Sequence, residues 1–237
     1  MNKTNPSLHS YYLKLIVFIL ITFANFWWIL ILKENFLYGL LLILITFILF
    51  FASFNVFSGL KLSVIMGVLF VILSTLLIKN HFDYTLKTLS PTDEKIQTQR
   101  HGVYADGLGI LFTNKLSQNF YKNWSMSLGK YLRNISYSVD PNLYFFSSHP
   151  REKSGIDEFE KYSPFLLPIF IIGVLIHALS FGKIKALTAY LLASIIITGF
   201  ISPYFKLGPI LLFPYISIVI ALGAASVIKK NYVKKAL

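Results

Sequence analysis

Residues 36–54 read FLYGLLLILITFILFFASF, an apolar run without a charged side chain. A helix needs about 20 apolar residues to cross the hydrocarbon core of a bilayer. The run does not alternate between apolar and polar residues, as a strand of a transmembrane barrel does. It therefore predicts a membrane-spanning helix and places the chain among the α-helical membrane proteins.

Five further apolar stretches of similar length accompany this run. Of the 237 residues, 55% are hydrophobic and 14% are charged, whereas soluble domains carry about 25% charged residues. We expect an all-α, polytopic membrane protein with about six transmembrane helices, at 13–32, 36–54, 60–78, 164–181, 184–201 and 208–228. The chain then divides into an N-terminal membrane unit (1–78), a mainly helical and irregular outer-face domain (79–163) and a C-terminal membrane unit (164–237).

The lysines of the short loops and tails predict the orientation, because cytoplasmic loops carry an excess of Lys and Arg. With the N-terminus inside, the outer short loops hold only Lys33 and Lys206. The inner segments hold Lys3, Lys14, Lys61, Lys183, Lys185, Lys229, Lys230, Lys234 and Lys235. We therefore expect both termini in the cytoplasm. The abundance of Ile, Lys, Asn and Phe fits an AT-rich coding sequence and favours a bacterial inner membrane.

The charge and the cysteine content exclude several kinds of site. The chain has no cysteine, so it forms no disulfide and no thiolate zinc site. Its net charge of +12 lies largely at the ends of spans, where such charges set topology, so no nucleic-acid partner is expected. His149 has no second histidine at ligand spacing, and neither a metal nor a cofactor is expected.

The polar segment contains one helix start and one glycine-rich stretch. In Ser90-Pro91-Thr92-Asp93-Glu94, a serine cap, a proline at the first helical position and two acidic residues predict a helix that runs to about Arg100. Residues 102–109, GVYADGLG, predict a turn or loop.

Residues 118–137, QNFYKNWSMSLGKYLRNISY, predict a second helix in this segment. Its apolar residues recur every three or four positions and form one stripe: Phe120, Trp124, Leu128, Leu132 and Ile135. Lys122, Lys130 and Arg133 lie off the stripe. Two placements are open: the helix lies on the outer leaflet with its basic residues near headgroups, or it packs on protein.

Two polar side chains stand out within the predicted spans. Asn25 is expected to hydrogen-bond to a neighbouring helix, and His177 is expected to face the cytoplasmic interface. No span carries Asp or Glu at its centre, which disfavours an ion-coupled transporter.

Residues 131–173 read YLRNISYSVDPNLYFFSSHPREKSGIDEFEKYSPFLLPIFIIG. This stretch resembles the last outer loop and following span of bacterial membrane glycosyltransferases of the GT-C type, the relatives of protein mannosyltransferases and aminoarabinose transferases. The resemblance rests on Tyr131-Leu132, Ser136, Pro141, the 143–146 cluster, His149, Arg151, Leu167-Pro168 and Gly173. The chain is also similar to small membrane proteins of candidate-phylum bacteria that share NLYFF, HPRE and EFEK.

The chain departs from that family in two ways. The family has many more spans, and it carries a catalytic acid in a long first outer loop. Here the first outer loop is Lys33-Glu34-Asn35, which makes Glu34 the weak candidate for a catalytic base. The resemblance therefore implies a module without the usual catalytic loop.

Such a module would bind a lipid-phosphate, such as polyprenyl phosphate, or a partner membrane protein at the outer leaflet. Arg133, His149, Arg151 and Lys153 would contact phosphate. Tyr144, Phe145 and Phe146 would anchor the chain at the level of the headgroups. A purely topological interpretation of the same stretch, as an aromatic belt and a charged stop before the next span, is also open.

Two further alternatives remain. One is a complete glycosyltransferase that moves a hexosyl or pentosyl group from polyprenyl phosphate, with Glu34, Asp93 or Asp106 facing a cavity between helices. The other is a structural or assembly subunit that depends on a neighbouring protein.

Overall fold

The computed structural model describes residues 8–54, 60–108, 114–146, 160–180 and 184–235. These residues form helices, with one isolated β-bridge between Phe82 and Ile201, which confirms the predicted all-α class. The elements are α1 (Leu8–Phe23), α2 (Phe26–Glu34), α3 (Phe36–Ser53), α4 (Leu60–His81), η1 (Tyr84–Leu86), α5 (Pro91–Leu108), α6 (Lys115–Asn119), the π-helix η3 (Phe120–Trp124), α7 (Ser125–Val139), α8 (Asn142–Phe145), η5 (Pro164–Leu166), α9 (Leu167–Leu179), α10 (Lys185–Thr198), η6 (Ile210–Leu212) and α11 (Phe213–Lys235).

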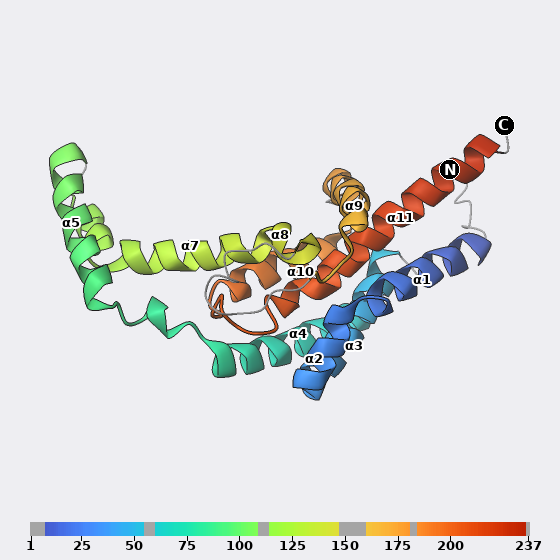
Figure 1. Ribbon diagram of the computed structural model, residues 1–237, viewed down its shortest axis with the longest axis horizontal. Helices are drawn as coiled ribbons and strands as arrows, with labels where there is room; N and C mark the ends of the chain where they lie inside the picture. Colours follow the sequence, from blue (N-terminus) through green and yellow to red (C-terminus); the bar gives the residue numbers. More distant parts are fainter. Residues whose placement is uncertain (1–7, 55–59, 109–113, 147–159, 181–183, 236–237) are drawn as a thin grey trace.

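Helix α11 is the central element of the bundle. Every residue from Ile210 to Ala221 is buried, and α1, α3 and α9 pack against it. Helix α1 begins and α11 ends at the same end of the molecule, which we call the terminal end (Figure 1). The opposite end, where α2 meets α3 and where α4 ends, is called the arm end.

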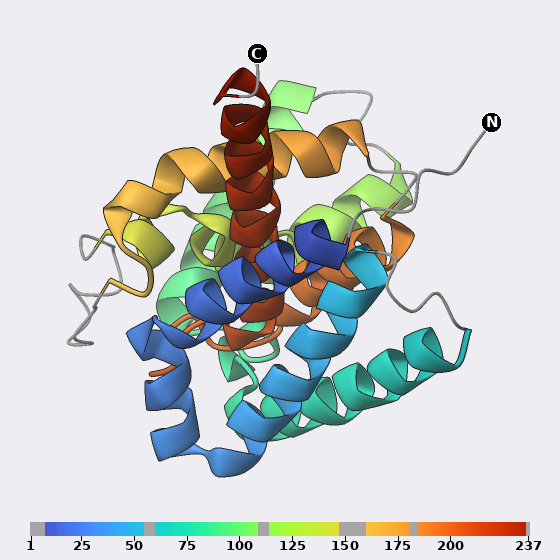
Figure 2. The ribbon, with the colours of Figure 1, turned by 90° about the vertical axis from the view of Figure 1, so that its right-hand side faces the viewer.

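The six predicted segments lie in helices of unequal length. Among the described residues, three helices are long and apolar enough to cross a membrane: Phe36–Ser53, Leu62–His81 and Ile210–Ile228. The pair Lys14–Phe23 and Phe26–Glu34 makes a fourth candidate if it counts as one bent span. Residues Pro164–Leu179 and Lys185–Thr198 form shorter apolar helices, and α9 crosses α11 steeply rather than alongside it (Figure 2).

The first predicted span is broken at Asn25, where α1 and α2 meet at a bend of 56°. The Asn25 side chain donates to the carbonyls of Ile21 and Thr22 and accepts from the amides of Trp27 and Trp28. The prediction that Asn25 bonds to a neighbouring helix is therefore wrong. Unsatisfied backbone groups cost several kcal/mol in lipid, and one asparagine caps both helix ends locally.

Two glycines allow the backbones of α9 and α11 to touch. A Cβ at Gly173 would overlap the carbonyl oxygen of Val219, and a Cβ at Gly223 would overlap that of Ile169. Small residues at helix crossings provide this close approach in membrane proteins, where packing rather than the hydrophobic effect holds helices together. The crossing therefore fixes α9 on the central helix.

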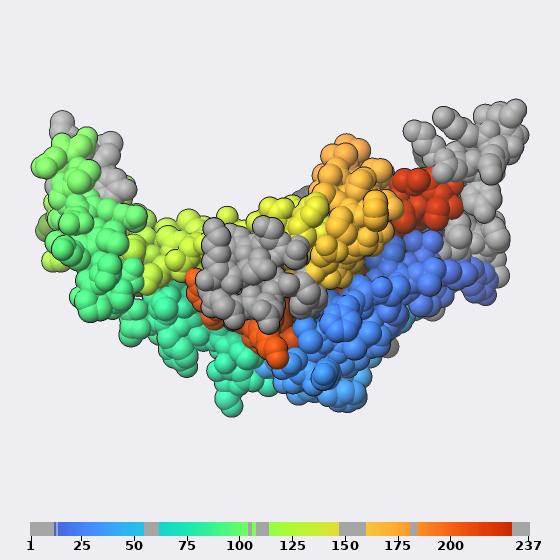
Figure 3. Space-filling model, in the orientation of Figure 1, coloured from blue at the N-terminus to red at the C-terminus, as the bar shows by residue number. Residues whose placement is uncertain are grey.

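The polar segment forms an arm that projects beyond the bundle (Figures 1 and 3). We call residues 91–108 and 114–139, which hold α5, α6, η3 and α7, the arm. The helix start at Ser90 is confirmed, but α5 continues to Leu108, so the turn predicted for 102–109 is wrong over 102–108. Glycine lowers helix stability by about 1 kcal/mol, yet extending a formed helix costs less than starting one.

We expect Gly173→Ala to destabilise the protein by about 1–3 kcal/mol, the usual cost of overpacking a tight interior. Thermal unfolding in detergent would measure the loss. Gly67→Ala in α4 is the matched control, because a Cβ there meets nothing within 4 Å. Equal melting temperatures for the two variants would contradict the close crossing.

Candidate functional site

Helix α7 buries its polar face and exposes its apolar face. Lys130, Asn134 and Ser138 are 8%, 0% and 6% exposed, and they follow one another at intervals of four residues. Trp124 and Leu132 are 62% and 54% exposed. The predicted apolar stripe is therefore confirmed as one helical face. Its orientation is the reverse of that found in a soluble helix, which turns the apolar face to the core.

A buried hydrogen bond holds the polar face of α7 in place. The Asn134 amide Nδ2 donates to Asp83 Oδ2 at 2.8 Å and to the carbonyl of Gly199 at 3.2 Å. The other carboxylate oxygen of Asp83 accepts from the amide and the hydroxyl of Thr85. One asparagine thus ties α7 to the chain after α4 and to the end of α10.

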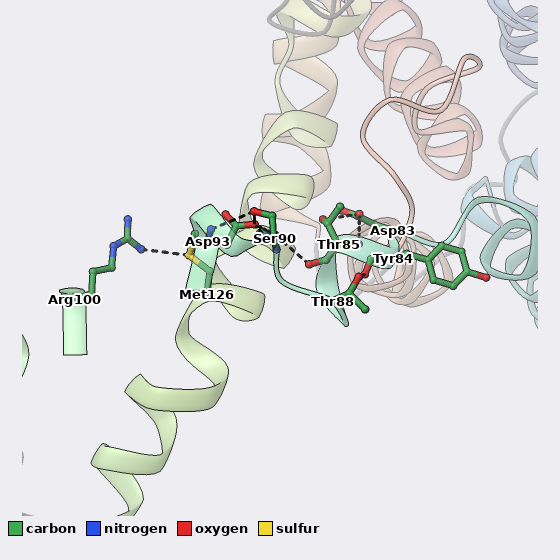
Figure 4. Close-up of polar contacts among 9 residues, drawn as sticks. Asp83, Tyr84, Thr85, Thr88, Ser90, Asp93, Arg100 and Met126 are labelled. Carbon is green, nitrogen blue, oxygen red and sulfur yellow. Dashed lines mark hydrogen bonds and ion pairs between the residues drawn. The ribbon is translucent and has the colours of Figure 1, made fainter. Parts of the chain in front are cut away.

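An ion pair makes a second tie, one turn along α7. Lys130 Nζ lies 2.7 Å from Asp93 Oδ2 and 3.2 Å from the carbonyl of Thr85. Asp93 also accepts from the Ser90 hydroxyl at the start of α5 (Figure 4). Hydrogen bonds from Lys130 and Ser90 lower the pKa of Asp93 to about 2. Lys130 was expected near headgroups, and the structure instead pairs it inside the arm.

The exposed face of α7 forms one wall of an apolar groove of about 620 Å³. Its lining is almost entirely carbon, with Lys87 at the rim. We call this feature the groove; it is lined by Phe82, Leu86, Lys87, Phe120, Trp124, Ser127, Leu128, Tyr131 and Phe200. A hollow of this size, with so apolar a lining, suits a hydrocarbon chain.

The groove continues onto the exposed face of α10. Leu192 and Ile196 are 52% and 53% exposed, and Phe200, at 38%, follows them on the same side. Phe200 packs on Tyr131 with ring centroids 4.8 Å apart, and the Tyr131 hydroxyl donates to the carbonyl of Ile196. Burial raises the pKa of Tyr131, so the phenol stays a donor. The two apolar faces therefore form one surface.

A second hollow of about 610 Å³, with more polar groups in its lining than the groove has, lies at the arm end of the bundle. We call it the cleft; it is lined by Glu34, Asn35, Tyr38, Asn80, His81, Phe82, Tyr84, Ser202, Tyr204, Phe205, Lys206 and Leu207. Glu34, the weak catalytic candidate, lies here and pairs with Lys206 at 2.5 Å. A catalytic role for Glu34 would require this ion pair to open.

The predicted phosphate-binding residues are only partly described. Arg133 lies on α7 and is exposed. His149, Arg151 and Lys153 lie outside the described residues. Among the described residues, no group of three or more His, Cys, Asp or Glu side chains could hold a metal ion.

The predicted aromatic anchors lie mainly inside the protein. Tyr144 and Phe145 are 3% and 0% exposed, and Phe146 is 38% exposed. The Tyr144 ring packs on Trp27, and its carbonyl accepts from the amides of Lys161 and Tyr162. The rings of Tyr144 and Phe145 are therefore not available to headgroups, because α8 folds back onto the bundle and makes them part of the core.

His177 is buried rather than at an interface, which corrects the sequence-based expectation. Its ring nitrogens lie 3.2 Å from the Tyr215 hydroxyl and 3.0 Å from the Thr188 hydroxyl. These contacts join α9 to α10 and α11. Polar side chains at helix contacts usually stabilise such packing.

Sequence reasoning missed the buried network and both hollows. Lys130, Asn134 and Ser138 at intervals of four were a readable signal of a polar helical face. Asp83, the partner of Asn134, and Asp93, the partner of Lys130, lie far from them in sequence, as does the groove wall at Phe200, so no local pattern reveals these contacts.

Comparison with known proteins assigns no function to this site. No protein-family model, no curated protein and no solved structure matches the chain. The function must therefore be argued from the site.

We expect Asn134→Ala to destabilise the attachment of the arm by about 1–3 kcal/mol, because it removes the donor to Oδ2 of the buried Asp83. Hydrogen exchange of α7 amides would measure the change. Ser136→Ala on the exposed side of α7 is the control. Unchanged protection in Asn134→Ala would contradict the role of this side chain.

The Lys130–Asp93 pair predicts a pH dependence at low pH. The folded pKa of about 2 lies below the usual value of about 3.9, so the contribution of Asp93 to stability is present above about pH 4 and is lost as the pH falls toward 2. The difference in melting temperature between wild type and Asp93→Asn should shrink over this window. Asp106→Asn, at an exposed position, should show no such change, and a constant difference for Asp93→Asn would refute the prediction.

Proposed function

We propose that this protein is a multi-pass membrane protein that binds a lipid at the outer face through the groove. The observation that carries the proposal is the continuity of the groove with the exposed apolar face of α10. The lipid that covers α10 can cover α7 without a break. The groove thus offers a path for a lipid chain from the bilayer to the arm.

The inverted orientation of α7 supports a lipid as the occupant. Trp124, Leu128 and Leu132 are 62%, 42% and 54% exposed, and contiguous apolar surface of this kind marks membrane or protein interaction sites. On the polar face of the helix, Lys130, Asn134 and Ser138 make hydrogen bonds within the protein. Lys87, Lys122 and Arg133 are exposed, and basic residues beside an apolar helical face suit phosphate headgroups.

The arrangement of the termini supports an outer-face location for the arm. Helix α1 begins and α11 ends at the terminal end (Figure 1), which fits an even number of crossings. The lysine bias puts both termini in the cytoplasm, and the arm then lies on the outer face. A bacterial inner membrane with six crossings, two of them by the short α9 and α10, belongs to the same proposal.

The headgroup of the proposed lipid carries phosphate. Arg133 on α7, with His149, Arg151 and Lys153 farther along the sequence, supplies donors that suit it. The resemblance of residues 131–173 to GT-C glycosyltransferases makes polyprenyl phosphate the first lipid to test. Kinship with the non-catalytic part of such enzymes is part of this proposal.

Leu128→Asp should weaken lipid retention by about tenfold or more, because it puts a charge where a hydrocarbon chain would lie. Native mass spectrometry in detergent, with polyprenyl phosphate and phosphatidylglycerol as probes, would measure retention. Leu116→Asp is the matched control, since Leu116 is 77% exposed and does not line the groove.

Equal retention by Leu128→Asp and Leu116→Asp would overturn the proposal. A membrane protein that co-purifies with wild type and is lost with Leu128→Asp, without a change in lipid, would favour the subunit alternative. Arg133→Ala tests the contribution of the phosphate group separately from that of the hydrocarbon chain. It should reduce binding of both phosphate lipids while leaving α7 folded.

A further inference from the structure

The cleft and the groove share a wall. Phe82 lines both hollows, and its ring meets that of Tyr84 edge to face at 5.4 Å. One side of Phe82 is lined by carbon, and the other carries Glu34, Lys206 and several hydroxyl and amide groups. Adjacent apolar and polar hollows match the two parts of an amphiphile.

We infer that the cleft binds the polar head of a lipid whose chain lies in the groove, and that this head is zwitterionic, with a phosphate and an ammonium group. The inference rests on the proposed lipid-binding function. It places the head in the cleft, where Lys206 rather than a basic residue of α7 meets the phosphate, and it favours a zwitterionic phospholipid over polyprenyl phosphate.

The two charged side chains of the cleft favour a zwitterionic head. Among the described residues that line it, the fully charged side chains are Glu34 and Lys206, one acid and one base. A purely anionic head would meet Lys206 but would also face the carboxylate of Glu34 close by. A zwitterion can place its phosphate on Lys206 and its ammonium on Glu34, which replaces one ion pair by two.

Opening the existing ion pair costs little. Glu34 and Lys206 lie 2.5 Å apart, but their side chains are 35% and 67% exposed. Exposed pairs of this kind contribute little to stability, since water competes for both charges. The pair therefore holds both groups in place for a ligand without resisting exchange.

Aromatic side chains around the pair suit the ammonium group. Tyr84 and Tyr204 are 67% and 48% exposed at the rim of the cleft. Cations bind favourably over the faces of such rings. The His81 ring stacks on Phe205 at a centroid distance of 3.9 Å and provides a flat wall beside Lys206.

The fold fixes the two charged residues independently of each other. Glu34 ends α2, and the next residue, Asn35, caps α3 through the amide of Tyr38. Lys206 sits in a turn closed by the Gly208 amide on the carbonyl of Phe205, and Gly208 has a positive φ of 71°. The Phe82–Ile201 bridge holds this turn beside the end of α4.

The test compares headgroups at equal concentration on the full-length protein. Phosphatidylethanolamine, phosphatidylglycerol and polyprenyl phosphate are each titrated and read out by native mass spectrometry. Wild type should prefer phosphatidylethanolamine by about fivefold, the size expected from one extra exposed ion pair. Glu34→Gln should abolish this preference, and Lys206→Gln should weaken the binding of all three lipids.

Matched controls and competitors keep the outcomes distinct. Lys33→Gln, beside Glu34 but outside the lining of the cleft, should behave as wild type. Free O-phosphoethanolamine should compete poorly, because it lacks the chain that occupies the groove; strong competition would point to a soluble ligand and overturn the inference.

The inference and the proposed function fail separately. If Leu128→Asp abolishes lipid binding but Glu34→Gln leaves the headgroup preference unchanged, the zwitterionic head is refuted and the lipid function stands. A wild-type preference for polyprenyl phosphate or phosphatidylglycerol also refutes it. If neither variant alters lipid binding, both the lipid-binding function and the zwitterionic head are refuted.

Discussion

The hydrogen bond from Asn134 to Asp83 decides which face of α7 is buried, and the surface features depend on it. The asparagine side chain is fully buried and also reaches the carbonyl of Gly199. Hydrogen bonds to charged groups are stronger than neutral ones, and leaving one partner unmet in the interior is expensive. With the polar face held inward, the stripe around Leu128 must face outward and line the groove.

The backbone sets the shape of the membrane bundle, through its hydrogen bonds and through the close approach of helices. At Asn25 one side chain closes the end of α1 and the start of α2, which permits a bend of 56° within an apolar run. At Gly173 and Gly223 the absence of side chains lets backbone meet backbone across α9 and α11. In both places, a polar or a minimal residue in an apolar stretch has a geometric role.

The arm end of the bundle brings together segments that are distant in sequence. Glu34 ends α2, Phe82 follows α4, and Phe200 and Lys206 lie between α10 and α11. Their convergence produces an apolar hollow beside a polar one, separated by the ring of Phe82. A lipid has this same division between chain and head, which is why binding, rather than chemistry, is the function that the geometry supports best.

The sequence by itself determined the helical class, the apolar segments, the helix start at Ser90 and the stripe on α7, because each depends on residues within a few turns of one another. It did not determine the bend at Asn25, the burial of Tyr144 and His177, or the extension of α5 through Gly102 and Gly107. Only the tertiary structure decided these, and only it paired Asp83 with Asn134 and Phe82 with Ile201. A local periodicity predicts that one face of a helix is apolar. Whether that face meets protein or lipid depends on residues that lie far away in the sequence.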